Sequence, residues 1–522
     1  MNTRALYDGI TDIPDEMIEE AGAHRFRKSR PWIKFAAAAA AVAVAVGVGG
    51  VVSGRIQTPF SGAGAGGGGT AGPENGYSYM SYVGPVLPLT AVSGAEGVTA
   101  ERSVDFDFSP YKTRTETYGE GEDIHSYETW DSAAIVTDAY TLRNETDEDK
   151  TLSLLYPAIL SFRDAADCLP TVTVDGREAE TALHIGAYTG GYRGVSGADD
   201  PDGSANLDPI RSWEGYRALL SDDGYRRSAM EPLPELTVPV TVYRVDGYEV
   251  APTDAVNPSL KMSFRVDPET TRVMSWGANA LSNDAATGQY SRLVGGLDNL
   301  YRQPEPMYVI LYGGDIIGDY SLQGYKNAGG DPGTEIDVTA TVTRYETTLD
   351  ELLRQLVDEQ MSDERIYPEG ERDALMFAVP RETLYGLAAQ FLLEYGLMSD
   401  APKDRYAFGH LEHVFEAFSL QRVLYLAFDV TVPAGGSTDI TAVMRRDGSR
   451  DYIGPKMYSE GYDLATRLGS MLLFAEQRAS VSHTEEIEMV ENSFGFDIDS
   501  GLTAVTLDPA VEHYWMQVAK KG

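Results

Sequence analysis

The chain reads Val423-Leu-Tyr-Leu-Ala-Phe-Asp-Val-Thr-Val-Pro-Ala-Gly-Gly-Ser-Thr-Asp-Ile-Thr-Ala-Val443 near its C-terminal end. Two runs rich in β-branched and aromatic residues flank the turn Pro433–Gly436, a combination typical of two strands joined by a short loop. The pattern therefore predicts a β-hairpin with strands at 423–432 and 437–443.

The same alternation recurs upstream of this stretch. Between Ala134 and Arg143, one face carries Ile135, Thr137, Ala139 and Thr141, and the other carries Val136, Tyr140 and Leu142. The polar turn 144–149 separates this predicted strand from a second one at Thr151–Tyr156. Further strands are predicted at Thr171–Val174, Leu236–Val245, Leu260–Val266, Met307–Tyr312, Ile336–Tyr345, Ile487–Val490, Thr503–Leu507 and His513–Val518.

These strands predict a mainly β fold, α+β overall, with antiparallel sandwich-like sheets. Residues 140–157 and 425–443 share one pattern: a strand with alternating residues, then a turn, then a second strand. Two related sheets would explain this likeness, and so would two halves of one large sandwich.

A helical insertion is predicted near 348–418. Thr348 and Glu351 have the spacing of a capping box, and an apolar stripe follows from Leu349 to Val357. A second stripe runs from Leu384 to Tyr395 and stops before Gly396, where a helix is expected to end. A third, shorter helix is expected at Leu411–Phe418.

A different pattern marks the N-terminal part of the chain. Phe35–Val52 consists only of Ala, Val, Gly and Phe, which predicts a transmembrane helix. Basic residues cluster before it, and only Arg55 follows closely, so the N-terminus is expected in the cytosol and the rest of the chain outside the cell. A cleaved signal peptide is the alternative, with Ala63-Gly64-Ala65 as its cleavage site, although the preceding segment is long and contains acidic residues.

The composition divides the chain into six segments. We predict a cytosolic tail at 1–31, a transmembrane helix at 32–54, a Gly-rich linker at 55–76, a β-rich extracellular region at 77–346, a helical insertion at 347–420 and a C-terminal β-rich region at 421–522. The linker contains a G-x-G-x-x-G spacing, but no strand and helix flank it as a dinucleotide site requires.

Charge and cysteine content exclude several classes of protein. The formal net charge is -38, which repels nucleic acid and anionic lipid headgroups. Cys168 is the single cysteine, so the chain forms no internal disulfide and no multi-cysteine zinc site. We interpret Cys168 as a small buried apolar residue.

Few residue patterns suggest chemistry. His410 and His413 stand three residues apart, as two zinc ligands on a helix would, but the H-E-x-x-H order is absent. The acidic segment Asp199–Ser204 resembles part of a calcium loop without its closing glutamate. Ser437 follows two glycines but belongs to a turn. We assign no catalytic, cofactor-binding or metal-ligating residue, and no cofactor.

Aromatic residues offer a further hypothesis. The chain has 31 Tyr, and exposed tyrosines stack on sugars or anchor protein partners. Such a face would use Tyr77, Tyr79, Tyr82, Tyr188, Tyr192 and Tyr216. The same residues are also good strand formers, and we prefer that interpretation.

The N-terminal 50 residues carry a resemblance. Tyr7-Asp-Gly-Ile-Thr-Asp-Ile-Pro-Asp-Glu-Met-Ile-Glu-Glu-Ala21, then a basic stretch, Trp32 and the Ala-rich span, resembles the start of many single-pass membrane proteins of Gram-positive bacteria. Those segments are similar to the juxtamembrane part of anti-sigma factors. The resemblance implies a cytosolic partner for Met1–Arg30. The zinc-binding Cys/His pattern of one anti-sigma class is absent from the chain.

Two functions of different class follow from the sequence. The first is a membrane-anchored, non-enzymatic surface module that binds a glycan or a protein. The second is a transmembrane regulator, anti-sigma-like, that senses an envelope signal. A cell-wall or glycan hydrolase is a more distant alternative, since 80 acidic residues supply many carboxylate pairs but no pattern selects one.

Overall fold

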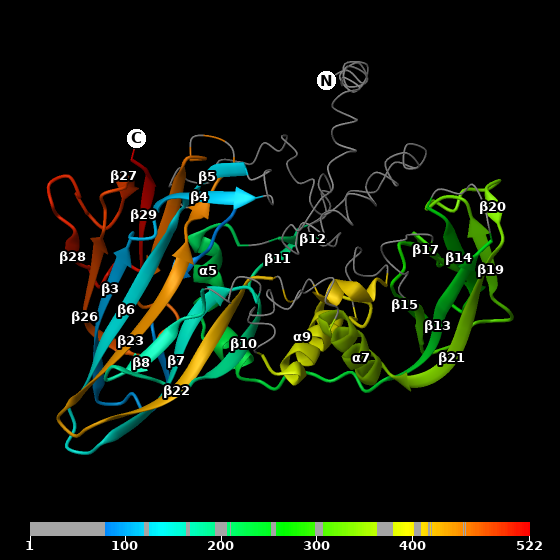
Figure 1. The fold of residues 1–522 in the computed structure, drawn as a ribbon. Coiled ribbons are helices and arrows are strands. Elements are labelled where there is room, and N and C mark those ends of the chain that lie inside the picture. The colour runs from blue at the N-terminus through cyan, green and yellow to red at the C-terminus, as the bar shows by residue number, and fades with distance from the viewer. Residues whose placement is uncertain are drawn as a thin grey trace.

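The computed structural model describes residues 79–118, 125–162, 168–193, 206–208, 210–251, 257–297, 306–362, 379–400, 409–415, 418, 420–452, 454 and 456–521. The predicted tail, membrane span and Gly-rich linker lie outside these residues. Within the described ranges, no helix is both long enough and apolar enough to cross a bilayer. The described chain is mainly β, as predicted, with two sandwich-like bodies and a group of helices between them (Figure 1).

The first sandwich has one broad sheet of seven strands. Their order is β28 (Ala504–Thr506), β26 (Leu473–Ser482), β3 (Val98–Asp107), β6 (Ala133–Asn144), β23 (Ser437–Asp447), β8 (Thr171–Val174) and β9 (Arg177–Glu178). Most neighbours are antiparallel, but β26 and β3 run parallel. Strands from both ends of the chain therefore share one sheet.

Two smaller sheets face the broad sheet. One contains β10 (Ala182–Tyr188), β22 (Arg422–Val432), β7 (Lys150–Leu160) and β2 (Thr90–Ser93). The other contains β1 (Pro85–Val86), β25 (Ser459–Ala465), β29 (His513–Lys520) and β27 (Ile487–Asn492), with β24 (Ser449–Arg450) beside β25. Val104, Leu154 and Tyr514 come from the three sheets and lie in one hydrophobic core.

The predicted hairpin at 423–443 is wrong in its pairing. The structure confirms both strands, but β22 pairs with β7 and β10, whereas β23 pairs with β6 and β8. The turn Pro433–Gly436 thus carries the chain from one sheet to the opposite one. The turn between β6 and β7 does the same, so the two similar segments form two halves of one large sandwich.

Asn144 joins the two sheet-changing turns. Its side-chain Nδ2 donates to the carbonyl oxygens of Glu148, Val432 and Pro433 at 2.8, 3.1 and 3.1 Å. Its Oδ1 accepts from the backbone N–H of Thr146 at 3.0 Å. Because Asn144 is buried, these bonds replace water at carbonyls that the turns would otherwise leave unpaired.

The second sandwich is formed by one continuous part of the chain. One sheet has the order β15 (Arg272–Trp276), β18 (Met307–Tyr312), β13 (Pro239–Val250) and β21 (Val338–Thr348). The other has β16 (Ala280–Asp284), β17 (Gln289–Gly295), β14 (Ser259–Arg265), β19 (Ser321–Tyr325) and β20 (Glu335–Ile336). Val245, Met262 and Val309 lie in the core between them.

Helices lie between the two sandwiches, and they fall within the range 347–420 that was predicted as a helical insertion. They are α7 (Leu349–Ser362), α9 (Arg381–Glu394) and the short 3-10 helix η2 (Leu411–Phe415). The capping box is confirmed, since Glu351 N–H donates to Thr348 Oγ1 at 3.2 Å. Leu353 of α7 and Leu387 of α9 share a core with Val242 of β13 and Leu424 of β22, so this core contacts both sandwiches.

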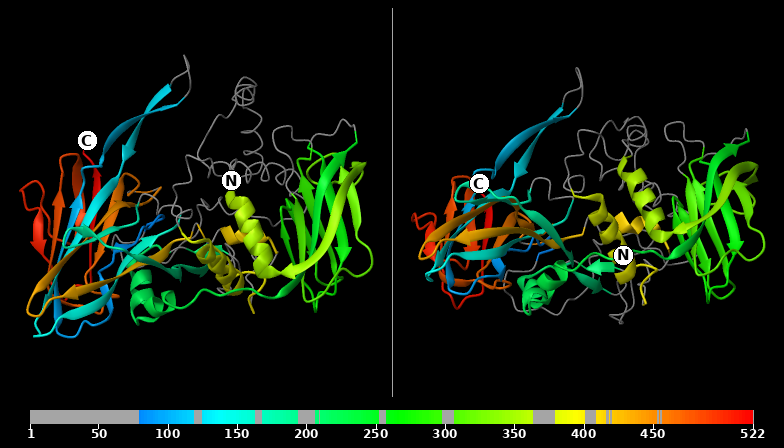
Figure 2. Two further views of the ribbon diagram at one scale, coloured as in Figure 1. Left: turned by 60° about the horizontal axis from the view of Figure 1, so that its bottom comes forward. Right: turned by 90° about the horizontal axis from the view of Figure 1, so that it is seen from below.

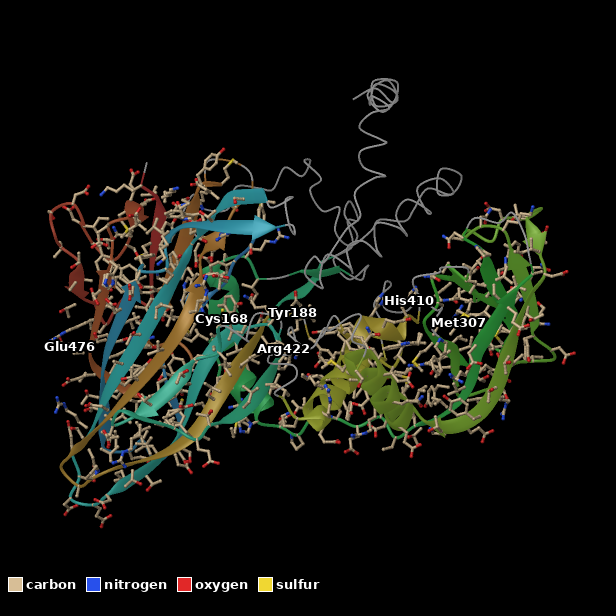
Figure 3. The ribbon with its side chains drawn as sticks, viewed as in Figure 1. Cys168, Tyr188, Met307, His410, Arg422 and Glu476 are labelled. Atoms are coloured by element: carbon tan, nitrogen blue, oxygen red, sulfur yellow. The ribbon has the colours of Figure 1, made fainter. Side chains whose placement is uncertain are left out.

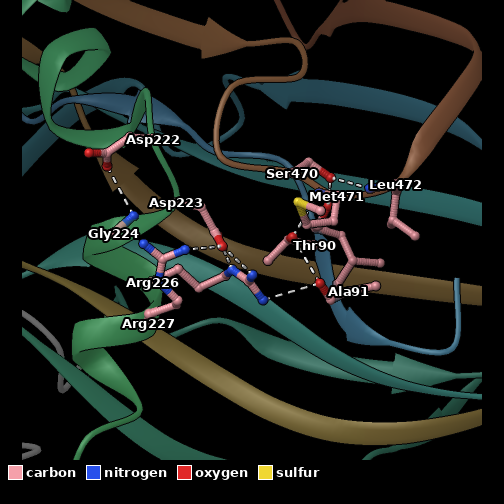
Figure 4. A network of polar contacts seen from close by, with 11 residues as sticks. Thr90, Ala91, Asp222, Asp223, Gly224, Arg226, Arg227, Ser470, Met471 and Leu472 are labelled. Atoms are coloured by element: carbon pink, nitrogen blue, oxygen red, sulfur yellow. Dashed lines mark hydrogen bonds and ion pairs between the residues drawn. The ribbon is translucent and has the colours of Figure 1, made fainter.

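Two short helices were not predicted. α5 (Trp213–Leu220) and α6 (Gly224–Ala229) cover the β22–β7 sheet on the face away from the sandwich core. Arg226 of α6 pairs with Asp223 and donates to the carbonyl of Ala91 in β2 at 3.3 Å (Figure 4). Because the β22–β7 sheet is buried on both faces, Val423–Phe428 is almost continuously apolar.

Four further strands form two separate pairs. β4 (Lys112–Tyr118) and β5 (His125–Asp131) form a two-stranded hairpin that projects from the first sandwich (Figure 2). β11 (Gly191–Arg193) and β12 (Asn206–Asp208) pair with each other. At the base of the projecting hairpin, Lys520 Nζ lies 4.3 Å from the centre of the Trp130 ring.

We predict that Asn144→Ala destabilises the first sandwich by about 2 to 3 kcal/mol, because it leaves buried carbonyls without donors. Urea unfolding should show a lower midpoint. Thr151→Ala is the matched control: its hydroxyl bonds Thr431 on the exposed surface at 3.0 Å, so its loss should hardly change the midpoint. Equal midpoints for wild type and Asn144→Ala would contradict this role.

Candidate functional site: the outer face of the seven-stranded sheet

The broad sheet of the first sandwich has one face in the core and one face toward solvent. Along β3, Ala100, Arg102 and Val104 are buried, whereas Glu101 and Ser103 point outward. No helix is packed on this outer side in the described part of the chain (Figure 1). The face is therefore accessible to a ligand.

Short side chains form the middle of this face. Register places Ser103 of β3 opposite Ala139 of β6, and Ala139 opposite Thr441 of β23. Longer side chains surround them and leave a hollow of about 320 Å³. Its lining residues are Glu101, Arg102, Ser103, Ala139, Tyr140, Thr141, Asp439, Thr441, Glu476 and Arg478.

Charged groups around the hollow are paired. Arg143 Nε lies 2.9 Å from Glu101 Oε1, and Arg478 Nε lies 2.8 Å from Glu476 Oε1. The Arg143 guanidinium, by its hydrogen bond, lowers the pKa of Glu101 below the ordinary value. Thr141 Oγ1 donates to Asp439 Oδ1 at 2.8 Å. The hollow thus presents carboxyl, hydroxyl and guanidinium groups held by hydrogen bonds and ion pairs.

A buried ion pair supports the floor from inside. Arg102 binds Asp138 through two bonds of 2.9 Å, and both side chains are fully buried. Arg102 Nη1 also donates to the carbonyl of Ala465 in β25 at 2.7 Å. The hydroxyls of Tyr140 and Tyr156 donate to Asp138 Oδ2 at 2.8 and 3.0 Å. This network joins all three sheets directly beneath the hollow.

Three side chains of this network have shifted pKa values. Burial raises the pKa of the Tyr140 and Tyr156 hydroxyls well above the ordinary value. Burial alone would lower the pKa of Arg102, but the adjacent Asp138 carboxylate outweighs it and the pKa is raised. Tyr140, Tyr156 and Arg102 therefore keep their protons at physiological pH and hold the sheets together by hydrogen bonds and charge.

The histidine pair of the sequence lies elsewhere. Figure 3 shows His410 between the helices and the second sandwich, whereas Glu476 stands at the outer side of the first. The ring centres of His410 and His413 are 5.2 Å apart, and the segment is a 3-10 helix. Glu412 accepts a hydrogen bond from the Gly277 backbone N–H. Among the described residues, no three His, Cys, Asp or Glu side chains form a group that could hold a metal.

Two other histidines pair with carboxylates. His483 Nδ1 lies 2.7 Å from Asp107 Oδ1 on the surface. His513 Nε2 lies 3.0 Å from Asp463 Oδ2, and its buried ring stacks on Trp213 at 4.5 Å. Neither pair lines the hollow, so they contribute no general base to it.

The hypothesis of a tyrosine binding face is wrong for the residues that can be placed. Tyr79, Tyr82, Tyr188 and Tyr216 are all buried. They pack in cores, as strand- and helix-forming aromatic residues do. Tyr77 and the calcium-like segment Asp199–Ser204 lie outside the described residues, and the side chain of Tyr192 is not placed.

Cys168 is buried among the helices and strands of the central core, as predicted. Ser437 begins β23 at an exposed position. Neither side chain approaches the hollow.

Part of the hollow, the outward face of β6, was predicted from the sequence, although not as a binding site. The alternation that placed Ala139 and Thr141 on one face of β6 is confirmed. Strands β3 and β26 were not predicted, so the neighbours of this face were unknown. The alternation of apolar and polar residues in these strands, for example from Val98 to Asp107 in β3, is the pattern that could have predicted them.

Comparison of the chain with protein-family models, with curated proteins and with solved structures found no match of any kind.

We predict that Asp138→Ala destabilises the first sandwich by about 3 to 5 kcal/mol, because it leaves the Arg102 charge buried without its counter-ion. Glu101→Gln breaks an exposed ion pair and is expected to leave the urea midpoint unchanged. A loss below about 1 kcal/mol in Asp138→Ala would show that the buried pair does not hold the sheets together.

Proposed function

We propose that the chain is a membrane-anchored surface protein that binds a polar ligand on the outer face of its seven-stranded sheet. The hollow over Ser103, Ala139 and Thr441 is the observation that carries this proposal. The anchor is the predicted span Phe35–Val52, with the N-terminus in the cytosol and the remainder outside the cell.

A surface glycan fits the chemistry of the hollow best. Hydroxyls, carboxylates and guanidinium groups are the partners that sugar hydroxyls bind, and they stand here on rigid strands rather than on loops. The net charge of -38 disfavours nucleic acid and other polyanions as ligands. A protein ligand with a polar surface is the second class that this face could accept.

Binding is favoured over hydrolysis. Register places Glu101 of β3 directly beside Glu476 of β26, which gives two neighbouring carboxylates over the hollow. A glycosidase needs one such carboxyl to stay protonated through a raised pKa. Arg143 instead lowers the pKa of Glu101, and Glu476 is paired with Arg478. These pairs suit hydrogen bonding to a ligand and oppose a role as general acid.

A transmembrane regulator is the second candidate, and the resemblance of the N-terminal 50 residues to anti-sigma juxtamembrane segments favours it. Only about 30 residues would lie in the cytosol, whereas a stable interface usually buries about 800 Å² on each partner. Recovery of a sigma factor on immobilised Met1–Arg30 would make this candidate the better one.

We predict that Ala139→Trp abolishes or weakens ligand binding by at least about tenfold, because an indole at this position would fill the hollow. The measurement is binding of the full-length protein to immobilised surface glycans. Thr151→Trp places the same indole on an exposed position of the opposing sheet and should bind like wild type. Unaltered binding by Ala139→Trp would place the ligand elsewhere, and an absence of glycan binding would exclude this ligand class.

A further inference from the structure

Large apolar side chains are exposed in the loop between β24 and β25. Tyr458 is 77% exposed, Tyr452 is 66% exposed and Met457 is 43% exposed. Met80, 36% exposed, belongs to the same surface, because its backbone N–H donates to Asp451 Oδ1 at 2.8 Å. We name these four side chains the tyrosine–methionine patch. Their exposure contrasts with the burial of Tyr79 and Tyr82 next to them.

The patch is held by a defined backbone. Ser81 and Arg450 exchange two backbone hydrogen bonds of 2.9 and 2.8 Å. Lys456 Nζ lies 4.7 Å from the centre of the Tyr79 ring, which ties the loop to the first residue of the described fold. The exposed side chains thus project from a fixed support.

The patch lies where the chain enters the described fold from its N-terminal side. Roughly 26 residues separate Val52, the end of the predicted span, from Tyr79. Their Gly-rich composition predicts a mean end-to-end distance of about 30 Å. A short connection of this kind keeps its two ends at a millimolar effective concentration toward each other. A bilayer that holds the span would therefore meet this patch before other exposed apolar groups.

The chemistry of the patch suits the membrane–water interface. Tyrosine places its ring among lipid acyl chains and its hydroxyl among headgroups, and methionine is flexible and apolar. Beside the patch, Arg450 Nε lies 3.9 Å from Glu460 Oε1, and Lys456 Nζ lies over the Tyr79 ring.

We propose that the tyrosine–methionine patch rests in the interfacial region of the bilayer, so that the first sandwich lies against the membrane in one orientation. This inference rests on the proposed anchoring by Phe35–Val52 and adds a second membrane contact to it. Because apolar insertion drives the contact, added salt should change it little.

A second exposed apolar cluster provides a matched control. Val92, Met471 and Leu473 lie at the other end of the sandwich, and Met471 N–H donates to Thr90 Oγ1 at 2.9 Å (Figure 4). Leu473 pairs with Thr99 at the start of β3, whereas the end of β3 approaches the patch through the Tyr111–Glu460 hydrogen bond. Eight residues of strand separate these points by about 26 Å.

The test uses the full-length chain in phosphatidylcholine vesicles that contain bromine-labelled lipids. On a Cys168→Ala background, Tyr458→Cys or Leu473→Cys carries a fluorophore that bromine quenches. We expect quenching at position 458 to exceed that at position 473 by at least about fivefold, because only the patch reaches the acyl chains. Adding Tyr452→Ser and Met457→Ser should reduce the quenching at 458 toward the value at 473.

An alkaline wash of the same vesicles separates this inference from the anchor. Chain retained after the wash, with equal quenching at both positions, overturns the patch and leaves the anchor intact. Chain that washes off overturns both. Quenching at 458 that falls when the protein is diluted in lipid would identify a second copy of the chain as the occupant, and would also overturn the proposal.

Discussion

Two turns that change sheets determine the architecture of the first sandwich. The chain passes from the seven-stranded sheet to the opposing sheet between β6 and β7, and returns between β22 and β23. Asn144 donates hydrogen bonds in both turns, to the carbonyls of Glu148, Val432 and Pro433. Since β6 pairs with β23 and β7 with β22, each turn joins two strands that belong to different sheets. Residues 288 positions apart therefore meet at these turns, and the second sandwich and the helices are inserted between them in the sequence.

The candidate site depends on this arrangement. The floor of the hollow combines Ser103, Ala139 and Thr441 from three strands, and only the crossing turns bring β23 beside β6. The Arg102–Asp138 pair then fixes β3 to β6 and reaches Ala465 in a further sheet. A ligand that spans the hollow would therefore contact residues whose positions are set by the whole core, which is the rigid support that a binding face requires.

Local patterns allowed the strands and helices to be predicted, but not their partners. The capping box at Thr348 and the alternation in β6 are confirmed, because each pattern depends only on residues within one helical turn or one strand. The hairpin at 423–443 was wrong because a short turn fits a crossing between sheets as well as a hairpin, and Val423–Phe428 is apolar on both faces. The hollow could not be predicted because its shape arises from cross-strand neighbours far apart in sequence. The tyrosine-face hypothesis, which the sequence already ranked below strand formation, could not be excluded from the sequence because strand periodicity does not show which face a neighbouring helix covers, as α5 covers Leu155 and Tyr425.

Disulfide trapping tests the crossing turns most directly. On a Cys168→Ala background, Thr141→Cys with Asp439→Cys joins residues that face each other between β6 and β23. Val430→Cys with Asp439→Cys joins residues that would face each other only if 423–443 were a hairpin. Under mild oxidation of the folded full-length protein, the account predicts a disulfide in the first variant and none in the second. Efficient bond formation between 430 and 439, without a bond between 141 and 439, would contradict it.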